Sequence, residues 1–284
     1  MQAECGIKTD GYSIVSEVIG LYFCCGITEK GTRENNEDAF LIRGSVRTEG
    51  GVQTGLSEPF VIALCDGVSG EQAGELASRT CLELLSQVDY SSRVNLKRRI
   101  LDIHTTIAEQ SVMQKSTANM QTTLCGIAVD ENEGLHCFNV GDSRIYRYRG
   151  GTLEQLSRDQ TLVQMLYEEG SISVEEKRVH AHRHIVMPVI GNLEAEPKPE
   201  VIVYPDGMRL GDVLMLCSDG LSDYVTTFEM EEVMAKPKPL PKRLQELVVL
   251  ALANGGKDNI TVSALVRYPD EIPIPGIKMP AAEE

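Results

Sequence analysis

The run FVIALCDG at residues 60–67 is an unbroken apolar stretch that ends in a carboxylate and a glycine. A second run, VLMLCSDG at residues 213–220, repeats this arrangement. Each apolar stretch has the length of a strand, and the Asp-Gly pair that follows is typical of a turn. A strand that ends this way places a charge at the rim of the core, where a cation or hydrogen bonds must offset its desolvation. The two runs therefore predict a sheet core with Asp66 and Asp219 at its edge.

Two further acidic sites stand directly before apolar runs, at Glu37-Asp38 and at Asp258-Asn259. If folding brings these strand ends together, the carboxylates cannot all remain ionised without a divalent cation. Oxygen ligands without nearby Cys or His favour Mg²⁺ or Mn²⁺ over zinc, so the sequence predicts a metal pair bridged by carboxylates. For any single Asp-Gly pair, an ordinary turn is favoured by roughly ten to one, and the hypothesis depends on the convergence.

Arg33 lies five residues before Asp38, in the string RENNED at residues 33–38. Beside a metal pair, a guanidinium can hold a phosphate through two parallel hydrogen bonds. Taken alone, Arg33 would be interpreted as an exposed surface residue. Its place next to the acidic cluster favours a phosphate-binding role.

Short runs bounded by Gly, Asp, Asn or Pro recur along the chain and predict strands. The predicted strands span residues 21–27, 39–42, 60–64, 122–129, 135–140, 144–148, 201–204, 213–217 and 260–266. Apolar residues three or four apart predict helices over 71–88, 94–113 and 242–253. Many strands with a helix pair inserted and another helix late in the chain predict packed sheets flanked by helices, in the α+β class.

A single domain is expected over residues 21–268, since 284 residues can form one large layered unit. Residues 1–20 are expected to be a peripheral extension, and residues 269–284 a flexible tail. Residues 157–192 carry two short predicted helices without a long apolar face. A surface flap is the expected structure there, with a plain surface excursion as the alternative.

Composition limits the partners and the compartment. The chain has 27 Lys and Arg against 42 Asp and Glu, a formal charge of -15 that disfavours nucleic acid and anionic membranes. Its eight cysteines form no CxxC pair and lie mostly in apolar runs, as buried free thiols do. With no signal-like N-terminus and no apolar run near the ~20 residues of a membrane span, a cytoplasmic protein is expected.

The order of the motifs resembles the PP2C (PPM) family of metal-dependent serine/threonine protein phosphatases, in its bacterial type. The matching strings are RENNED at 33–38, DGVSG at 66–70, QTT at 121–123, GDSRIY at 141–146, LSRD at 156–159, CSDGL at 217–221 and GKDNITV at 256–262. Each string alone is a weak signal, but their joint order is specific. The resemblance implies an αββα sandwich of two antiparallel sheets with a surface flap. It also implies two Mn²⁺ or Mg²⁺ ions and hydrolysis by a water shared between them.

The resemblance also implies roles for individual residues. Asp66 would bridge the two metals, and the Gly67 carbonyl would bind one of them. Asp219 and Asp258 would complete the shell of the other metal, and Asp38 with Glu37 would act mainly through bound waters. The remaining implied roles are Asn259 in support of the ligands, Asp142 at a weaker third metal, and Arg33 on the substrate phosphate.

Several residues depart from the family pattern and leave a second function open. Ser69, Glu71, Gln121, Ala181 and Pro188 stand where the bacterial type more often has other residues. The main function implied is hydrolysis of phosphoserine and phosphothreonine in proteins, with a cognate serine/threonine kinase and its substrates as partners and a monomer as the expected state. The alternative is a catalytically idle module of the same fold that binds phosphoproteins.

Three alternating histidines in the flap, His180, His182 and His184, carry a separate hypothesis. In an extended strand they would share one face and could chelate a metal. Solvated surface histidines are the interpretation that we favour.

Overall fold

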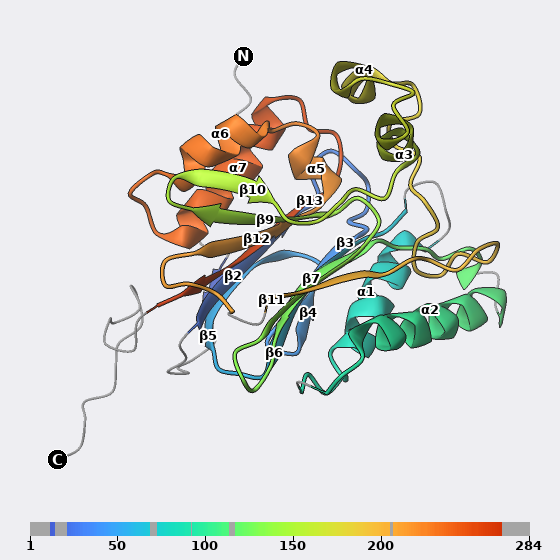
Figure 1. The fold of residues 1–284 in the computed structure, drawn as a ribbon, viewed down its shortest axis with the longest axis horizontal. Coiled ribbons are helices and arrows are strands. Elements are labelled where there is room, and N and C mark those ends of the chain that lie inside the picture. The colour runs from blue at the N-terminus through green and yellow to red at the C-terminus, as the bar shows by residue number, and fades with distance from the viewer. Residues whose placement is uncertain are drawn as a thin grey trace.

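The fold consists of two packed sheets with helices on both outer faces (Figure 1). The computed structural model describes residues 12–14, 22–68, 73–91, 93–113, 117–204 and 207–268. Within these residues the first sheet has the order β1 (Tyr12–Ile14), β5 (Gly50–Leu56), β2 (Tyr22–Glu29), β13 (Ile260–Arg267), β12 (Val213–Cys217), β9 (Arg144–Arg149) and β10 (Thr152–Gln155). The second has the order β11 (Glu200–Tyr204), β8 (Leu135–Val140), β7 (Leu124–Val129), β6 (Phe60–Asp66), β3 (Asp38–Ile42) and β4 (Ser45–Arg47).

The helices divide between the two outer faces. α1 (Gly74–Leu85) and α2 (Leu96–Met113) cover the second sheet, and α5 (Asp219–Ser222), α6 (Thr227–Met234) and α7 (Leu240–Ala253) cover the first (Figure 1). α3 (Leu162–Glu168) and α4 (Val174–Val179) project beyond the sheets at one end, at the upper right of Figure 1. The αββα sandwich with a flap is therefore confirmed.

The apolar runs that define the fold are buried on both faces of their sheets. In β6, Ile62 and Leu64 point into the core between the sheets, whereas Val61 and Ala63 point into the core under α1 and α2. β12 is built the same way, with Leu216 between the sheets and its odd-numbered residues Val213, Met215 and Cys217 under the C-terminal helices. A strand with two covered faces needs apolar residues at every position. This is why both runs lack the alternation of a half-exposed strand.

The neighbouring strands pair antiparallel, with one exception at an edge. β1 pairs parallel with β5, so part of the segment predicted to be a peripheral extension forms an edge strand. The rest of residues 1–20 and the predicted tail at 269–284 lie outside the described residues. The single domain over 21–268 remains a prediction.

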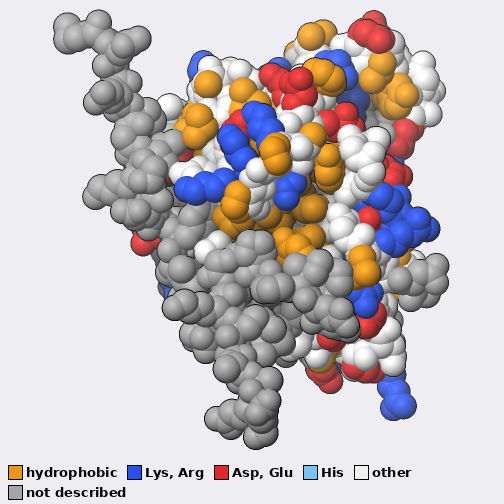
Figure 2. Space-filling model, turned by 90° about the vertical axis from the view of Figure 1, so that its left-hand side faces the viewer, with side chains coloured by type: hydrophobic (Ala, Val, Ile, Leu, Met, Phe, Trp, Pro, Cys, Tyr) orange, Lys and Arg blue, Asp and Glu red, His pale blue; other side chains and the backbone are white. Residues whose placement is uncertain are grey.

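One face of the molecule carries many basic side chains. Figure 2 shows a face on which Lys and Arg side chains gather next to apolar and acidic ones, although the whole chain carries a formal charge of -15. In the part of the chain that the structure describes, no helix is both long and apolar enough to cross a membrane.

Candidate metal centre

Four strand ends meet at one end of the sandwich. β3 and β6 run antiparallel, and Asp38 lies opposite Asp66 in their register. β12 and β13 also run antiparallel, so Asp219, just after β12, and Asp258, just before β13, lie at neighbouring ends of the other sheet. The topology therefore brings carboxylates from distant parts of the sequence to one end of both sheets.

Ser218 ties the two sheets together at this end. Its Oγ–H donates to Asp38 Oδ2 over 2.8 Å, and the same oxygen accepts the Thr261 N–H over 3.0 Å. Ser218 and Thr261 are fully buried. The contact places Asp38 of one sheet against the residue that precedes Asp219 in the other.

The carboxylates perturb one another, as a shared pocket requires. Burial raises the pKa of Asp66 well above its usual range, and the charges of Asp38, Asp219, Asp142 and Asp258 raise it further. Burial likewise raises the pKa of Asp219, with added contributions from Asp142, Asp223, Asp258 and Asp38. Like charges at this density favour either protonation or a bound cation.

Asp38 gives the clearest sign that the pocket fits a metal ion. Its side chain is 1% exposed, and burial raises its pKa to about 6 despite hydrogen bonds from Thr261 and Ser218. Within the described residues its Oδ1 is buried without a hydrogen-bond partner. Buried polar atoms are almost always paired, so an unpaired carboxylate oxygen facing other carboxylates fits a hard divalent cation.

Two glycines allow the loops of this centre to touch. A Cβ on Gly67 would lie 2.5 Å from the Gly74 carbonyl oxygen, and a Cβ on Gly220 would lie 1.9 Å from the Asn259 carbonyl oxygen. Both contacts are with backbone, which cannot move aside cheaply. Close packing of the loops, and not a positive φ, therefore requires the glycine after each aspartate.

Hydrogen bonds from Arg33 and Asn259 hold the loop that carries Glu37 in place. Arg33 Nη2 donates to Asp258 Oδ2 over 2.8 Å, and its side chain is 44% exposed, so it lies at the mouth of the centre. Asn259 Oδ1 accepts the Glu37 N–H over 2.8 Å, and its Nδ2 donates to the Lys30 and Asn35 carbonyls. Asn259 therefore holds the backbone of the RENNED loop, and its support of metal ligands stays a prediction.

Asp142 lies in the turn between β8 and β9, beside the same cluster. Burial raises its pKa to about 6, and Asp159 adds to the shift. Thr123 Oγ1 accepts the Asp66 N–H over 3.0 Å and is 2.8 Å from Ser143 Oγ. This buried pair of hydroxyls connects the Asp66 and Asp142 segments.

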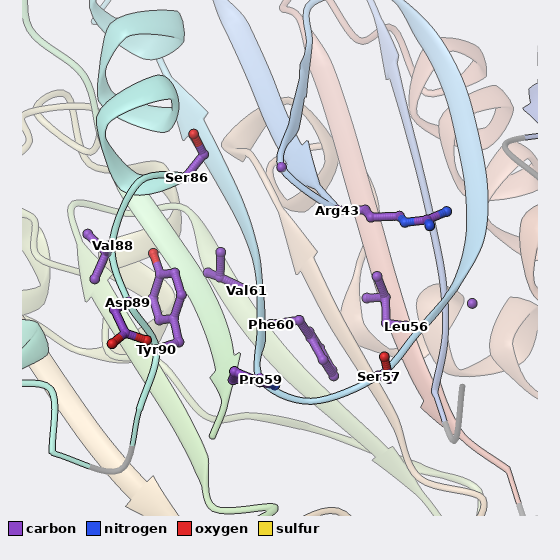
Figure 3. Close-up of a pocket in the computed structure, with 12 residues that line it drawn as sticks. Arg43, Leu56, Ser57, Pro59, Phe60, Val61, Ser86, Val88, Asp89 and Tyr90 are labelled. Carbon is purple, nitrogen blue, oxygen red and sulfur yellow. The ribbon is translucent and has the colours of Figure 1, made fainter. Parts of the chain in front are cut away.

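A cavity lies at the end of β3 and β6 that is opposite to the carboxylate cluster (Figure 3). It has a volume of about 370 Å³ and is lined by Arg43, just after β3, by Phe60 and Val61 at the start of β6, and by Asp89 and Tyr90 after α1. Asp38 and Asp66 stand at the opposite ends of β3 and β6. This cavity therefore contains none of the clustered carboxylates.

Comparison with known proteins agrees with this geometry. A family model described as Protein phosphatase 2C matches residues 32–254, most of the chain. The chain belongs to the protein phosphatase 2C family. The PP2C match includes every segment of the centre up to α7 and ends just before Asp258.

Several bacterial PP2C relatives are similar over most of this chain. The serine/threonine protein phosphatase PstP of Mycobacterium tuberculosis is 34% identical over 233 residues, 78% of this chain and 44% of PstP. The chain thus spans under half the length of that relative. The serine/threonine phosphatase stp of Listeria welshimeri is 30% identical over 243 residues, 82% of this chain and 95% of stp.

Solved structures of the family share the fold, and one of them is described in complex with two manganese ions. The crystal structure of M. tuberculosis PstP has a TM-score of 0.71 at 32% identity, covering 87% of this chain and 100% of that one. The PstP catalytic domain in complex with two manganese ions has a TM-score of 0.68 at 30% identity, covering 87% and 100%. The manganese of that PstP structure is the type of ion that the carboxylate cluster of this chain fits.

His184 of the flap lies close to two carboxylates of the body, a cluster that sequence patterns did not identify. In the described part of the chain, His184, Asp219 and Asp223 offer ligand atoms that all lie within 4.8 Å of one another. The premise of the three-histidine hypothesis is wrong, because residues 181–184 form a turn and not an extended strand. His180 instead accepts the His182 N–H at Nδ1 over 3.1 Å.

The departures from the PP2C pattern have mixed structural outcomes. Gln121 Oε1 accepts a hydrogen bond from Asn192 Nδ2 over 3.0 Å, so this residue ties the end of the flap to the β6–β7 region. Ser69 and Glu71 lie outside the described residues. Nothing in the structure explains Ala181 or Pro188.

Proposed function

We propose that this chain hydrolyses phosphoserine and phosphothreonine in proteins with two divalent cations, Mn²⁺ or Mg²⁺. The observation that supports this most directly is the cluster of Asp38, Asp66, Asp219 and Asp258 at one end of the sandwich, next to Arg33. Relatives named as serine/threonine phosphatases at 30–34% identity support the same reaction.

Each acidic residue takes a distinct place in the proposed centre. Asp66 has Asp38, Asp142, Asp219 and Asp258 as electrostatic neighbours, which suits a residue that would bridge both ions. The Gly67 carbonyl would bind one ion, Asp219 and Asp258 would complete the shell of the other, and Asp38 and Glu37 would act mainly through water. Bound there, two cations would polarise the phosphate and lower the pKa of a water molecule.

The chain's own residues supply positioning and charge. Arg33 binds the phosphate oxygens, because it is exposed at the mouth and already oriented by a carboxylate of the cluster. Ser218 fixes Asp38, and Asn259 fixes the loop that carries Glu37. Together these contacts keep the ligands in one arrangement before substrate arrives.

Two cysteines near the centre are unsuited to act as nucleophiles. Cys65 and Cys217 precede Asp66 and Asp219 closely, but both are fully buried in helix-covered cores. Burial raises the pKa of Cys217 to about 12 and that of Cys65 well above its usual range. A thiol that stays protonated is a poor nucleophile, so attack by water is favoured.

We place a weaker third cation at Asp142, whose raised pKa reflects the same acidic environment. The His184, Asp219 and Asp223 group offers a second set of ligands next to it.

The substrates proposed are phosphorylated proteins, including a cognate serine/threonine kinase and its targets, and the chain is proposed to act as a monomer. The seven cysteines in the described residues are buried and free, which fits a reducing compartment such as the cytoplasm.

Phosphate release from a phosphothreonine peptide tests the proposal. Activity is expected with Mn²⁺ or Mg²⁺ and not in chelator. Asp66→Asn should lower turnover by about three orders of magnitude or more, because it removes the bridging charge. Asp89→Asn is the matched control, since Asp89 lines the other cavity near the far end of β6.

Calorimetric titration with Mn²⁺ separates the main proposal from the idle module. A phosphatase should bind Mn²⁺ and turn over the peptide. Mn²⁺ binding with no turnover under either metal would favour the phosphoprotein-binding alternative. Near-normal turnover by Asp66→Asn would mean that the centre is misassigned.

A further inference from the structure

A groove lies between the flap and the body of the sandwich, directly beside the metal centre. It has a volume of about 760 Å³, within the range of ligand sites. Asp142 and Asp219 line one part of it, residues of α4 and the turn that follows line another, and the start of α6 completes it. A peptide whose phosphorylated side chain enters the centre can therefore continue along this groove.

Most of the charged residues that line the groove already have partners. Arg144 donates to Asp159 through Nε at 3.0 Å and Nη2 at 2.8 Å, and Lys177 of α4 lies 3.5 Å from the same carboxylate. His184 Nδ1 lies 3.6 Å from Asp223 Oδ2. Asp142 and Asp219 belong to the proposed metal centre, where cations would offset their charge.

Two arginines in the groove differ from these residues. Arg178, in the last turn of α4, and Arg183, in the turn after it, both line the groove and are exposed. Among the described residues, neither guanidinium has a recorded hydrogen bond or ion pair. What sets Arg178 and Arg183 apart from other exposed arginines is their place in a groove beside the acidic cluster, where a bound ligand can reach them. A ligand with anionic groups would supply the partners that the fold does not.

Apolar side chains complete the same surface. Val174 and Val179 of α4 line the groove and are 44% and 80% exposed. The valines can contact the aliphatic part of an acidic peptide side chain, while the arginines bind its charged end.

We propose that Arg178 and Arg183 bind anionic side chains that flank the phosphorylated residue, so that the enzyme prefers phosphopeptides with additional negative charge. This inference rests on the proposed phosphatase function. A carboxylate and a phosphate each offer two oxygens that can accept parallel hydrogen bonds from one guanidinium. The groove therefore selects for charge near the phosphorylated residue and not for one residue type.

The test compares three phosphothreonine peptides that differ only in the flanking residues. One carries alanines, one carries aspartates two and three residues to either side, and one carries a second phosphothreonine. The wild-type protein should process the two anionic peptides with a kcat/KM roughly threefold to tenfold above that of the neutral peptide, as expected for two exposed ion pairs. The gain should appear in KM and shrink in high salt.

The double variant Arg178→Ala/Arg183→Ala should reduce this ratio to below about twofold, because it removes both ion pairs. Each ratio is taken within one protein, so a general loss of activity cancels. Arg178→Lys/Arg183→Lys should keep part of the preference, since the charges remain. Arg209→Ala, which removes an exposed arginine before the start of β12, at the far end of that strand from Asp219, should keep all of it.

Two outcomes would overturn the inference. One is a wild-type protein that hydrolyses all three peptides equally, and the other is a double variant that keeps the full preference. Both leave the phosphatase function intact. Absence of turnover on every peptide would instead contradict the proposed function itself. A preference for only the aspartate peptide or only the doubly phosphorylated one would contradict selection for charge and not for one residue type.

Discussion

Asp38→Asn is expected to make the cation-free protein more stable while it removes a proposed metal ligand. Asp38 is 1% exposed, and burial raises its pKa from 3.8 to about 6. At about 1.36 kcal/mol per pKa unit, the ionised carboxylate lowers the free energy of unfolding at pH 7 by about 3 kcal/mol. Asparagine is neutral, and its oxygen can still accept the hydrogen bond from Ser218. Urea unfolding in chelator at pH 7 should therefore show a gain of up to about 3 kcal/mol.

The pH dependence gives this prediction a definite sign. Because the folded pKa of Asp38 is raised, the folded state binds more protons than the unfolded state between pH 3.8 and about 6. Stability from the protonated carboxyl is complete below that window and is lost as pH rises through it. The gain from Asp38→Asn should thus fall to about 1.6 kcal/mol at pH 5 and vanish near pH 3.

Asp212→Asn is the matched control with the opposite sign. Asp212 is also buried, at 3% exposed, but it lies just before β12, at the other end of that strand from Asp219. Burial raises its pKa, and hydrogen bonds from Arg149 and the Arg209 backbone outweigh this and lower the pKa overall. Asp212→Asn should therefore destabilise the protein at pH 7. Mn²⁺ should still raise its melting temperature, whereas Asp38→Asn should weaken that effect. An Asp38→Asn protein less stable than wild type in chelator at pH 7 would refute the reasoning.

Other contacts of the centre give three more expected outcomes. Arg33→Lys should lower kcat/KM for a phosphopeptide about tenfold, because lysine keeps the charge but cannot bind phosphate through a planar pair of donors; unchanged steady-state kinetics would contradict the phosphate role. Gly220→Ala should destabilise the fold by about 1–3 kcal/mol or more and weaken Mn²⁺ binding, because the new Cβ would lie 1.9 Å from the Asn259 carbonyl oxygen. Urea unfolding checks this, and wild-type stability would mean that the loops are not in contact. Mn²⁺ affinity measured by calorimetry should fall as pH is lowered from 7 to 5, because protons compete for Asp38 and Asp142, whose pKa values are both about 6; a flat profile would place the cation elsewhere.

The strands that could be predicted are those whose own residues require burial. β8 and β12 have the bounds that the sequence indicated, and β6 begins at the predicted Phe60 but ends at Asp66, two residues after the predicted end at Leu64. β5 was missed because its sequence, GGVQTGL, has three glycines and no sustained apolar pattern. It forms because it pairs along nearly all of β2, a partner that no local pattern indicates. α6 was missed although it carried a readable signal, the capping box of Thr226 and Glu229.

The candidate site, like the fold, could be predicted only in part from the sequence. The sequence marked Asp38, Asp66, Asp219 and Asp258 because each stands at the end of an apolar run. Their convergence depends on which strands become neighbours, and this is decided by the whole fold. Ser218 and Thr123 were missed as supports, although small hydroxyl residues in otherwise apolar strands were a usable sign. His184 had no such sign, because its contact with Asp219 and Asp223 depends on how the flap returns to the body.

The acidic centre works against the stability of the fold that carries it. The cost of ionised Asp38 alone, about 3 kcal/mol at pH 7, is a sizeable part of the 5–15 kcal/mol by which domains are stable. A cation that binds only the folded state at a hundred times its Kd returns about 2.7 kcal/mol. Because the two magnitudes are similar, a bound cation would offset most of the charge penalty as well as provide the chemistry. The apolar strands on either side, buried on both faces, hold the carboxylates together in spite of their repulsion. This explains why the acidic residues lie at the ends of the most apolar strands, where the backbone is least able to relax away from them.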